Sequence, residues 1–307
     1  MTTRSRTGAA GPTVGIDMGG TMIRGGLVEA DGTLRRVVRR PLPEAPGARH
    51  AAVVELARDL GEHATAVGLA VAGVVEDGRL QLSANVGLTD VDLRADLGDA
   101  TGLPVEVVND AQAAALAEVR GSAAGGLILV VTVGTGIGGA LVLDGRLVRG
   151  RGFAGEIGHV VVDRGGQPCG CGAAGCWEGL ASGGALRRVA ERVLPGPGRT
   201  VDRLVASAEA GMPQAVDAVA LAAEAFAEGL NSMCAALAPH RIVLGGGVFA
   251  RGGLVAELYR ARAAERRWVR GAEITMATWG DRAGLVGAGF AAHDLVAARR
   301  TPTAAHL

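Results

Sequence analysis

The chain contains no lysine, because all 31 of its basic residues are arginine. This absence excludes a P-loop lysine, the strand lysine of protein kinases and a Schiff-base lysine together. Aromatic residues make up only 3% of the chain and apolar residues 49%, so the core must be built from Val, Leu, Ala and Ile. The 31 acidic residues bring the net charge to zero. The charge therefore gives no electrostatic case for nucleic acid or an anionic membrane as a partner.

No targeting segment is expected. Residues 1–12 are polar and contain glycine, without the apolar centre of a signal peptide. No uninterrupted apolar stretch reaches the length that spans a membrane. A length of 307 residues predicts two domains or lobes with ample core. With no export signal and with cysteines suited to a metal, we expect a cytoplasmic protein.

Cysteine is scarce, yet three of the four cysteines, Cys169, Cys171 and Cys176, stand close together shortly after His159. Three thiolates and one imidazole are the ligand set of a closed tetrahedral zinc site. A disulfide is the alternative, but the first two cysteines are poorly placed to pair with each other. We therefore expect a structural zinc ion that holds a loop and does not take part in catalysis. Glu156 and Glu178 flank this loop, at 156–178.

An internal repeat links two distant parts of the chain, 14–28 and 129–143. Each copy has the pattern of an apolar strand, a glycine turn and a second strand, followed by an Asp-Gly turn. The two Asp-Gly turns, at Asp31 and Asp144, lie 113 positions apart. A repeat of this length fits two similar lobes better than a solenoid. The alternation of strands and helices predicts an α/β protein with two lobes and a central cleft.

Hydrophobic periodicity predicts the main elements. The expected helices are 50–60, 111–120, 182–194, 215–237 and 283–297, and the expected buried strands are 66–72, 105–108 and 241–248. The expected lobes are 12–112 and 113–282, followed by a disordered tail over 298–307. We expect the helix at 283–297 to pack back onto the N-terminal lobe.

Three glycine-rich turns each follow an apolar strand, at 19–20, 134–139 and 245–247. Such turns let backbone amides approach and cradle phosphate oxygens, although a tight hairpin explains any one of them equally well. Asp17 and Thr21 bracket the first turn. Three such turns, with an acidic residue at the first, favour nucleotide binding. The first turn leads into a second strand, so it does not fit the dinucleotide-binding fingerprint.

Asn109 and Asp110 follow the expected strand 105–108 and open a helix. A carboxylate at this position is explained by helix N-capping, which satisfies orphan backbone donors. It is also the expected place for a general base, at the carboxyl end of a central strand facing a cleft. The two residues alone leave both interpretations open.

Five motifs in this order resemble the signature series of the ROK family: Asp17-Met-Gly-Gly-Thr21, Val108-Asn-Asp-Ala-Gln112, Gly134-Thr-Gly-Ile-Gly-Gly139, Glu156-Ile-Gly-His159 and Cys169-Gly-Cys-Gly-Ala-Ala-Gly-Cys-Trp-Glu178. Their order and spacing match from about Val14 to Gly289, and the Glu-x-Gly-His motif followed by the cysteines is the most specific part. This family comprises bacterial sugar kinases and related repressors with the actin-like, hexokinase-like (ribonuclease H-like) ATPase fold. The resemblance is strongest to its ATP-dependent glucokinases.

The resemblance implies an ATP-dependent sugar kinase that uses Mg²⁺, with Asp110 as the general base that takes the proton of a hexose 6-hydroxyl. The residues implied for the phosphates, Mg²⁺ and adenosine are Asp17, Gly19, Gly20, Thr21, Gly134, Thr135, Gly136, Gly245 and Gly246. The residues implied for the sugar are Gly73, Asn85, Asn109, Asp110, Glu156, His159 and Glu178. One ring nitrogen of His159 would bind zinc, and the other would reach a sugar hydroxyl.

Glucose is the substrate that the resemblance favours. The segment Asn85-Val-Gly-Leu-Thr lacks the tryptophan that the family usually places beside the sugar. Val108 and Gln112 also depart from the family's usual acidic residue and asparagine. Since the 85–89 segment borders the sugar, glucosamine, N-acetylmannosamine or 3-amino-3-deoxyglucose is the alternative.

Other functions in this family are a sugar-responsive repressor and a non-catalytic sensor. Only 16 residues precede Asp17, too few for a helix-turn-helix domain, and no basic stretch is suited to DNA. The presence of both Asp17 and Asp110 argues against a sensor. A polyphosphate donor is less expected, because the relatives that use it generally lack the zinc cluster. The resemblance also suggests a homodimer or tetramer.

Overall fold

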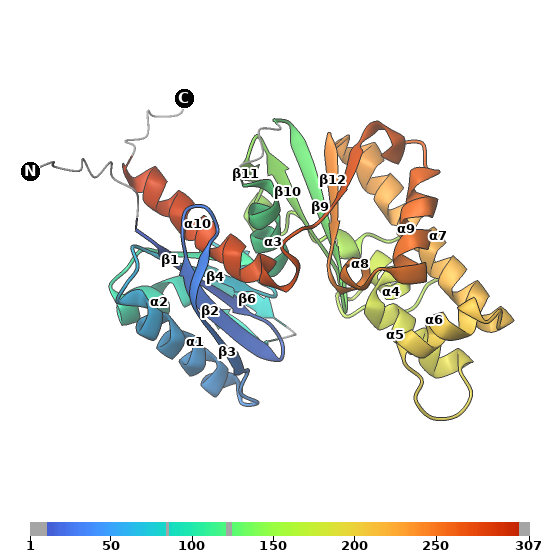
Figure 1. The fold of residues 1–307 in the computed structure, drawn as a ribbon, viewed down its shortest axis with the longest axis horizontal. Coiled ribbons are helices and arrows are strands. Elements are labelled where there is room, and N and C mark those ends of the chain that lie inside the picture. The colour runs from blue at the N-terminus through green and yellow to red at the C-terminus, as the bar shows by residue number, and fades with distance from the viewer. Residues whose placement is uncertain (1–10, 84–85, 121–124, 301–307) are drawn as a thin grey trace, which may run out of the picture. The chain divides into compact units, whose positions relative to one another are not determined.

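The computed structural model describes residues 11–83, 86–120 and 125–300. Its chain divides into two compact units (Figure 1). The first unit takes in residues 1–121, 150–153 and 281–307, and the second takes in 122–149 and 154–280. Each unit holds a five-stranded sheet, and helices cover the sheets, so the expected α/β class is confirmed.

The first unit is built on a mixed sheet with the strand order β3-β2-β1-β4-β8. Its strands are β1 (Thr13–Met18), β2 (Met22–Val28), β3 (Leu34–Pro41), β4 (Val67–Val71) and β8 (Val105–Asn109). The first three form an antiparallel meander, whereas β1, β4 and β8 run parallel. The parallel strands are apolar and almost wholly buried, as expected for strands covered on both faces.

Helices α1 (Pro46–Gly61), α2 (Leu93–Thr101) and α3 (Asp110–Val119) belong to the same unit. A small antiparallel sheet, β5 (Val74–Glu76), β6 (Arg79–Ser83) and β7 (Leu88–Val91), stands between β4 and α2 in the chain. The sequence did not predict this sheet, because its strands have only three to five residues each. The 3₁₀ turn η1 (Gly150–Gly152) also belongs to this unit.

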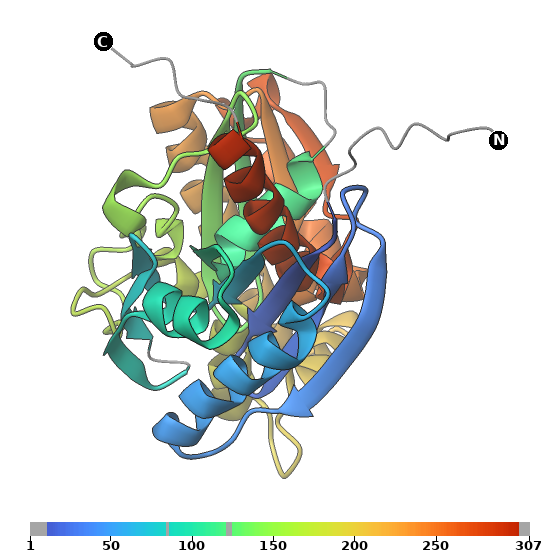
Figure 2. The same ribbon diagram turned by 90° about the vertical axis from the view of Figure 1, so that its left-hand side faces the viewer.

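The last helix, α10 (Ala283–Arg300), packs on the first sheet and on α3, as Figure 2 shows in red. The approach is so close that a Cβ atom at Gly68 would lie 1.8 Å from the carbonyl oxygen of Ala288. The buried His293 forms a 2.9 Å hydrogen bond from Nε2 to the Val28 carbonyl. The helix continues three residues past its predicted end, so the first part of the predicted tail is helical, and 301–307 lie outside the described residues.

The second unit repeats this strand order as β11-β10-β9-β12-β13. Its strands are β9 (Leu127–Val133), β10 (Ile137–Leu143), β11 (Arg146–Leu147), β12 (Arg241–Gly245) and β13 (Glu273–Met276). As in the first sheet, β11, β10 and β9 form an antiparallel meander, and β9, β12 and β13 run parallel. The repeat in the sequence therefore corresponds to two sheets of one topology.

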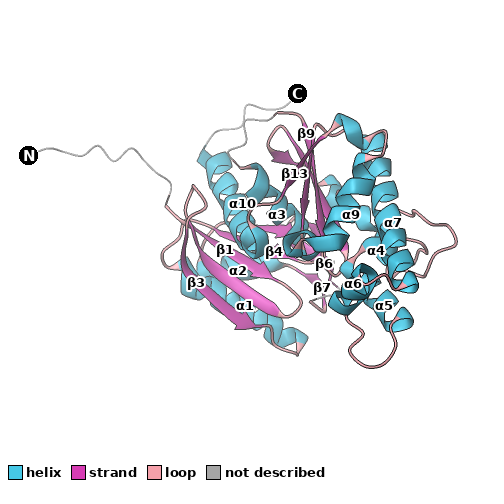
Figure 3. Ribbon diagram, turned by 45° about the vertical axis from the view of Figure 1, so that its right-hand side comes forward, coloured by secondary structure: helices cyan, strands magenta, loops and turns pink. Residues whose placement is uncertain are grey.

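Figure 3 draws all helices in cyan, and most helices of the second unit follow the loop 156–178, which itself contains η2. The helices of this unit are η2 (Ile157–His159), α4 (Trp177–Ala181), α5 (Gly183–Val193), α6 (Val201–Glu209), α7 (Pro213–Leu237), α8 (Gly247–Arg251), α9 (Gly253–Ala264), η3 (Val269–Gly271) and η4 (Gly280–Arg282), although η4 joins the two units. Four of the chain's few aromatic side chains form one cluster in this core, in which Phe226 stacks on Tyr259 and the other ring pairs are tilted or edge-on: Trp177, Phe226, Phe249 and Tyr259.

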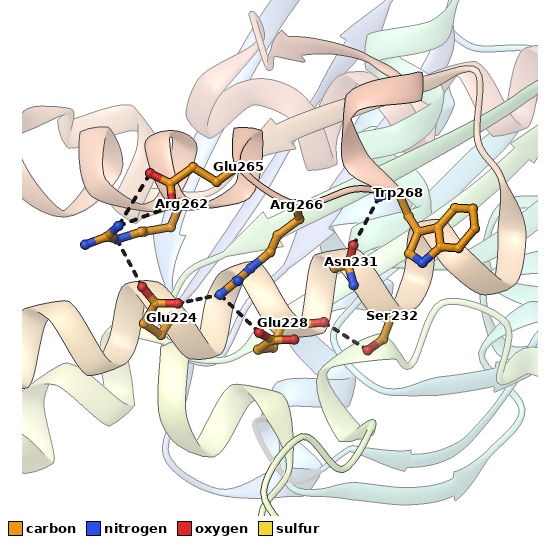
Figure 4. A network of polar contacts seen from close by, with 8 residues as sticks. All are labelled: Glu224, Glu228, Asn231, Ser232, Arg262, Glu265, Arg266 and Trp268. Carbon is orange, nitrogen blue, oxygen red and sulfur yellow. Dashed lines mark hydrogen bonds and ion pairs between the residues drawn. The ribbon is translucent and has the colours of Figure 1, made fainter.

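Polar contacts fix α9 and the segment after it to α7 (Figure 4). Arg262 pairs with Glu224 at 3.1 Å, and Arg266 pairs with both Glu224 and Glu228. The side-chain oxygen of Asn231 accepts a hydrogen bond from the amide of Trp268. Several charges shared in one network hold a helix better than isolated surface pairs do.

None of the helices in the described parts of the chain combines the length and the apolar character that crossing a membrane requires.

Candidate active site

The first glycine turn joins β1 to β2 and is held at both ends. The amide of Gly19 donates to the carbonyl of Met22 at 3.0 Å, and the amide of Leu42 donates to the carbonyl of Thr21 at 2.8 Å. Asp17, one residue before the end of β1, points to the face on which Arg24 lies, and the two form an ion pair at 3.2 Å. The turn therefore presents its backbone next to a fixed carboxylate.

Asp17 lies in an environment that disfavours its negative charge. Burial is the main cause that raises its pKa to about 6, while Arg24 opposes this rise and the charge of Asp110 adds to it. The side chain is only 15% exposed. A hard divalent cation stabilises the ionised form of a buried carboxylate whose pKa is raised further by the charge of a second carboxylate, so Asp17 fits a Mg²⁺ site.

Asp110 is the first residue of α3, and Asn109 is the N-cap. The side-chain oxygen of Asn109 accepts a 2.8 Å hydrogen bond from the amide of Ala111, and Gln112 accepts one from the amide of Asn109. This reciprocal pair is a capping box. The capping role that the sequence left open for Asp110 therefore belongs to its neighbour. Asp110 is exposed, although the protein around it raises the pKa of its carboxyl by reducing hydration.

Gly73 lies between β4 and β5, beside Asn109. The side-chain amide of Asn109 donates to the carbonyl of Gly73 at 2.9 Å. The third residue predicted to bind the sugar from this part of the chain, Asn85, lies outside the described residues. Its neighbour Val86 is described, and its carbonyl accepts a 2.5 Å hydrogen bond from Arg49 of α1.

The second glycine turn, between β9 and β10, has its carbonyls directed at the start of α5. The amide of Gly183 donates to the carbonyl of Gly134 at 2.8 Å, and the amide of Gly184 donates to that of Thr135 at 3.0 Å. The amide of Gly134 donates to the carbonyl of Gly136. Within the described ranges, the amides of Thr135 and Gly136 have no backbone acceptor. Two amides in one tight turn are the donors that an anion such as a phosphate takes up.

Glu178, at the end of the loop 156–178, lies between the second glycine turn and the cluster of His159 and the three cysteines. One of its carboxylate oxygens accepts a 3.4 Å hydrogen bond from the amide of Ile137 and would lie 2.5 Å from a Cβ atom at Gly136. The other oxygen lies 3.7 Å from Nδ1 of His159 and 3.7 Å from Sγ of Cys169. The carboxylate of Glu178 therefore contacts both the second glycine turn and the cluster of His159 and the cysteines.

The four predicted metal ligands converge. The ligand atoms of His159, Cys169, Cys171 and Cys176 all lie within 4.8 Å of one another. The last two sulfurs are 3.6 Å apart, so they are thiols and not a disulfide. In a tetrahedral site with zinc–sulfur bonds of about 2.3 Å, two sulfur ligands lie roughly 4 Å apart. The burial of Cys176 raises its pKa to about 12, so a thiolate there requires a bound cation. The site fits zinc.

The two ring nitrogens of His159 face different neighbours. Nδ1 lies 3.5 Å from the sulfur of Cys169, on the metal side. Nε2 lies 3.9 Å from the carboxylate of Glu156. The ring thus has one nitrogen for a metal and the other on the side of a carboxylate.

The third glycine turn follows β12. Gly246 has φ 88° and precedes α8, and a Cβ atom there would lie 2.6 Å from the amide nitrogen of Val133. The predicted strand 241–248 ends at Gly245, because the chain turns into α8 at Gly247. The third turn therefore lies against the end of β9, next to the second.

Each unit gathers its own part of the predicted set. The first holds Asp17, the 19–21 turn, Gly73, Asn109 and Asp110, and the second holds the other two turns, Glu156, Glu178 and the metal ligands. Sequence reasoning missed Arg24 and Arg49. The register of the hairpin, which pairs Asp17 with the residue seven positions later, was a signal for Arg24. No pattern in the sequence pointed to Arg49.

Two sheets of the same order, each with a glycine turn after its first strand, define the actin-like fold of sugar kinases. A ROK family glucokinase from Streptomyces griseus, solved with glucose and AMPPNP, matches with a TM-score of 0.78 and 32% identity over 92% of this chain and 100% of that one. The chain belongs to the ROK family, which matches residues 13–295.

Two relatives by sequence span nearly the whole chain. A glucokinase of Streptomyces coelicolor is 34% identical over 92% of this chain and 98% of its own length. An N-acetylmannosamine kinase of Citrobacter koseri is 37% identical over 91% of this chain and 98% of its own length. The two differ in the sugar they are named for and match this chain about equally.

Proposed function

We propose that this chain, an ATP-dependent sugar kinase of the ROK family, phosphorylates the 6-hydroxyl of a hexose, with glucose as the expected sugar. The observation that carries the proposal is Asp110. Its carboxylate is exposed at the first turn of α3, directly after the parallel strand β8, and its pKa is raised. A carboxylate whose pKa is raised above the ordinary aspartate value is a stronger base than an ordinary aspartate, which suits it to take a proton from a hydroxyl.

Phosphoryl transfer needs positioning and charge neutralisation more than covalent chemistry. Asp110 accepts the proton of the attacking hydroxyl. The backbone of Gly19, Gly20 and Thr21 and the free amides of the second turn hold phosphate oxygens. Gly245 and Gly246 lie beside the adenosine. Mg²⁺, when bound near Asp17, supplies charge neutralisation to the phosphates.

The sugar hydroxyls bind to polar groups that can both donate and accept hydrogen bonds. We assign this role to Asn109, Gly73 and Asn85, and to Glu156, His159 and Glu178. The amide group of Asn109 already donates one hydrogen bond to Gly73 and keeps a second N–H for the sugar. A structural zinc ion at His159 and the three cysteines fixes the loop on which Glu156 and Glu178 stand.

An N-acyl or amino hexose is the second candidate. It is supported by the 37% identity to an N-acetylmannosamine kinase, and by the absence of a tryptophan from the segment 85–89. A smaller side chain at such a position leaves room for a substituent on the sugar. A homodimer or tetramer, as the family resemblance suggests, remains part of the proposal.

The test is ATP-dependent ADP release, with zinc-loaded protein and Mg²⁺, against glucose, mannose, fructose, N-acetylglucosamine, N-acetylmannosamine, glucosamine and 3-amino-3-deoxyglucose. We expect turnover on glucose, and a loss of about 10²-fold or more in kcat for Asp110→Asn with sugar binding retained. Turnover only on an N-acyl or amino hexose would select the second candidate. No turnover combined with tight sugar binding would identify a sensor.

A further inference from the structure

A row of charged side chains crosses the edge of the first sheet. Asp17 of β1 is the cross-strand partner of Arg24 on β2, and Arg24 is the partner of Arg39 on β3. Cross-strand partners lie on one face of a sheet, so the three side chains are neighbours. Arg24 contacts Asp17 at 3.2 Å, and Arg39 contacts the carboxylate of Asp281 at 3.2 Å.

Arg24 also reaches the segment that leads into α10. Its Nη1 atom donates to the carbonyl of Asp281 at 3.2 Å. Gly284 lies in the first turn of α10, and a Cβ atom there would be 2.8 Å from the carboxyl carbon of Asp17. The carboxylate of Asp17 is thus held between a guanidinium and the amino end of an 18-residue helix, and both stabilise negative charge.

The pair is more than a solvated surface contact. The side chains of Arg24 and Asp17 are 29% and 15% exposed, whereas those of the pair Arg35–Glu29 on the same sheet are 68% and 28% exposed. Asp17 and Asp110 are both acidic, and because the chain has no lysine, any basic side chain that balances their charge is an arginine. Arg24 is in direct contact with Asp17 and brings a positive charge to its carboxylate.

We propose that Arg24 is a positioning residue for the nucleotide end of the reaction, because it holds the Asp17 carboxylate beside the 19–21 turn and ties it to the start of α10. This inference rests on the proposed assignment of Asp17 to Mg²⁺ and the phosphates. It requires no contact between Arg24 and the sugar. Loss of Arg24 should therefore weaken the Mg²⁺-dependent part of nucleotide binding and leave sugar binding unchanged.

The experiment measures the affinity of AMPPNP by calorimetry, with and without Mg²⁺, for the wild type, Arg24→Gln, Arg24→Lys and the control Arg35→Gln. The measured quantity is the factor by which Mg²⁺ strengthens AMPPNP binding. We expect Arg24→Gln to reduce this factor about tenfold, which corresponds to about 1.4 kcal/mol, and Arg24→Lys to restore part of it. Arg35→Gln, which removes an exposed ion pair away from Asp17, should match the wild type.

A purely structural role would lower the melting temperature of Arg24→Gln and leave its Mg²⁺ factor as in the wild type, and that result overturns the inference. Equal loss in Arg35→Gln would overturn it too. If Arg24→Gln does not fold, Arg24→Met, which keeps the aliphatic stem, is judged by the same criteria. A wild-type protein that binds AMPPNP equally well with and without Mg²⁺ would refute the assignment of Asp17 instead.

Discussion

The two aspartates of the first unit share a raised pKa but differ in their surroundings. Asp17 is nearly enclosed, is paired with Arg24 and has its carboxyl beside the amino end of α10, whereas Asp110 stays open to solvent at the start of α3. A charge held by fixed partners suits the binding of a cation. A basic carboxylate with solvent access suits proton transfer. Their different environments therefore separate the two roles.

The rate of the reaction should follow the ionisation of Asp110. A general base works only when deprotonated, so kcat/KM falls as the pH drops through its raised pKa. We expect the acid limb of the profile to lie above pH 3.8, the ordinary value for an aspartate. The measurement is kcat/KM between pH 4 and 8 at saturating Mg²⁺. A rate that stays constant down to pH 4 would contradict this.

The ionised carboxylate of Asp17 should lower the free energy of unfolding of the metal-free protein at neutral pH. Its pKa is about 6 when folded and 3.8 in the unfolded chain, so the unfolded state loses the proton first as pH rises. Stability contributed by this group is therefore lost between pH 4 and pH 7, by up to about 3 kcal/mol. Asp17→Asn, which cannot ionise, should be more stable than the wild type at pH 7.5, with the gap narrowing toward pH 4.

Urea unfolding without nucleotide or Mg²⁺ measures the difference in stability between Asp17→Asn and the wild type. Asp31→Asn is the control, in which the change in stability has the opposite sign. Hydrogen bonds from Thr33 lower the pKa of Asp31, so its ionised form stabilises the fold. Its removal should destabilise the protein slightly at pH 7.5, with a smaller effect near pH 4. A gap for Asp17→Asn that stays the same at both pH values would rule out the burial of its charge as the cause.

At the scale of elements, the junction between β8 and α3 shows how a short sequence restrains the residue proposed as the general base. Asn109 caps the helix and Gln112 closes the capping box, so the backbone on both sides of Asp110 is restrained. Gln112 is only 3% exposed, and the sequence marked it merely as a departure from the family pattern. Its longer side chain reaches back to the amide of Asn109.

Gln112→Ala should remove one half of this box and cost about 1 kcal/mol of stability. Because the first turn of α3 then loosens, we also expect kcat to fall several-fold. The matched control is Asp92→Ala, which removes the N-cap of α2 by breaking its bond to the amide of Ala95. The control should lose a similar stability with kcat unchanged. Thermal unfolding measures the stability of both variants, and steady-state kinetics measures their kcat. Equal kcat values in the two variants would disprove the role of Gln112 in positioning Asp110.

The elements with strong periodicity were predictable, and those defined by tertiary contact were not. The helices at 46–61, 213–237 and 283–300 and the strands at 67–71 and 105–109 lie within a few residues of their predicted bounds. The small sheet β5–β7 lacks a clear alternating pattern, since its strands have three to five residues. The convergence of His159 and the three cysteines could be predicted, because it follows from residue type and spacing. Arg24 was not recognised, because its partner is defined by pairing across a hairpin.

At the scale of the whole molecule, each unit has its own hydrophobic core. The cluster around Phe226 and Tyr259 belongs to the second unit, and the cluster around Ile16 and Leu69 belongs to the first. The loop 156–178, which holds the candidate metal ligands, contributes Ile157 and Trp177 to the second core. Loss of the metal should therefore act on one unit first.

Removing zinc with a chelator should lower the melting temperature and increase amide hydrogen exchange over 156–181 and the strands beside it. Exchange in β1 and β4 should stay as in the metal-bound protein. Hydrogen exchange with mass spectrometry resolves the two regions. Cys234→Ser, which alters a buried thiol of α7 away from the cluster, should retain full metal content. Metal-free protein with unchanged protection over 156–181 would show that zinc does not hold the loop.

The position of α10 bears on how the protein is made. The first sheet is complete in the chain by residue 109, but the helix that covers one of its faces begins only at Ala283. On the ribosome, the whole second unit emerges before that helix does, so the part synthesised first is the part that finishes folding last. This order is the reverse of the usual one, in which the N-terminal domain folds first during translation. The nascent first sheet must therefore be kept from aggregating while more than half of the chain is still being translated.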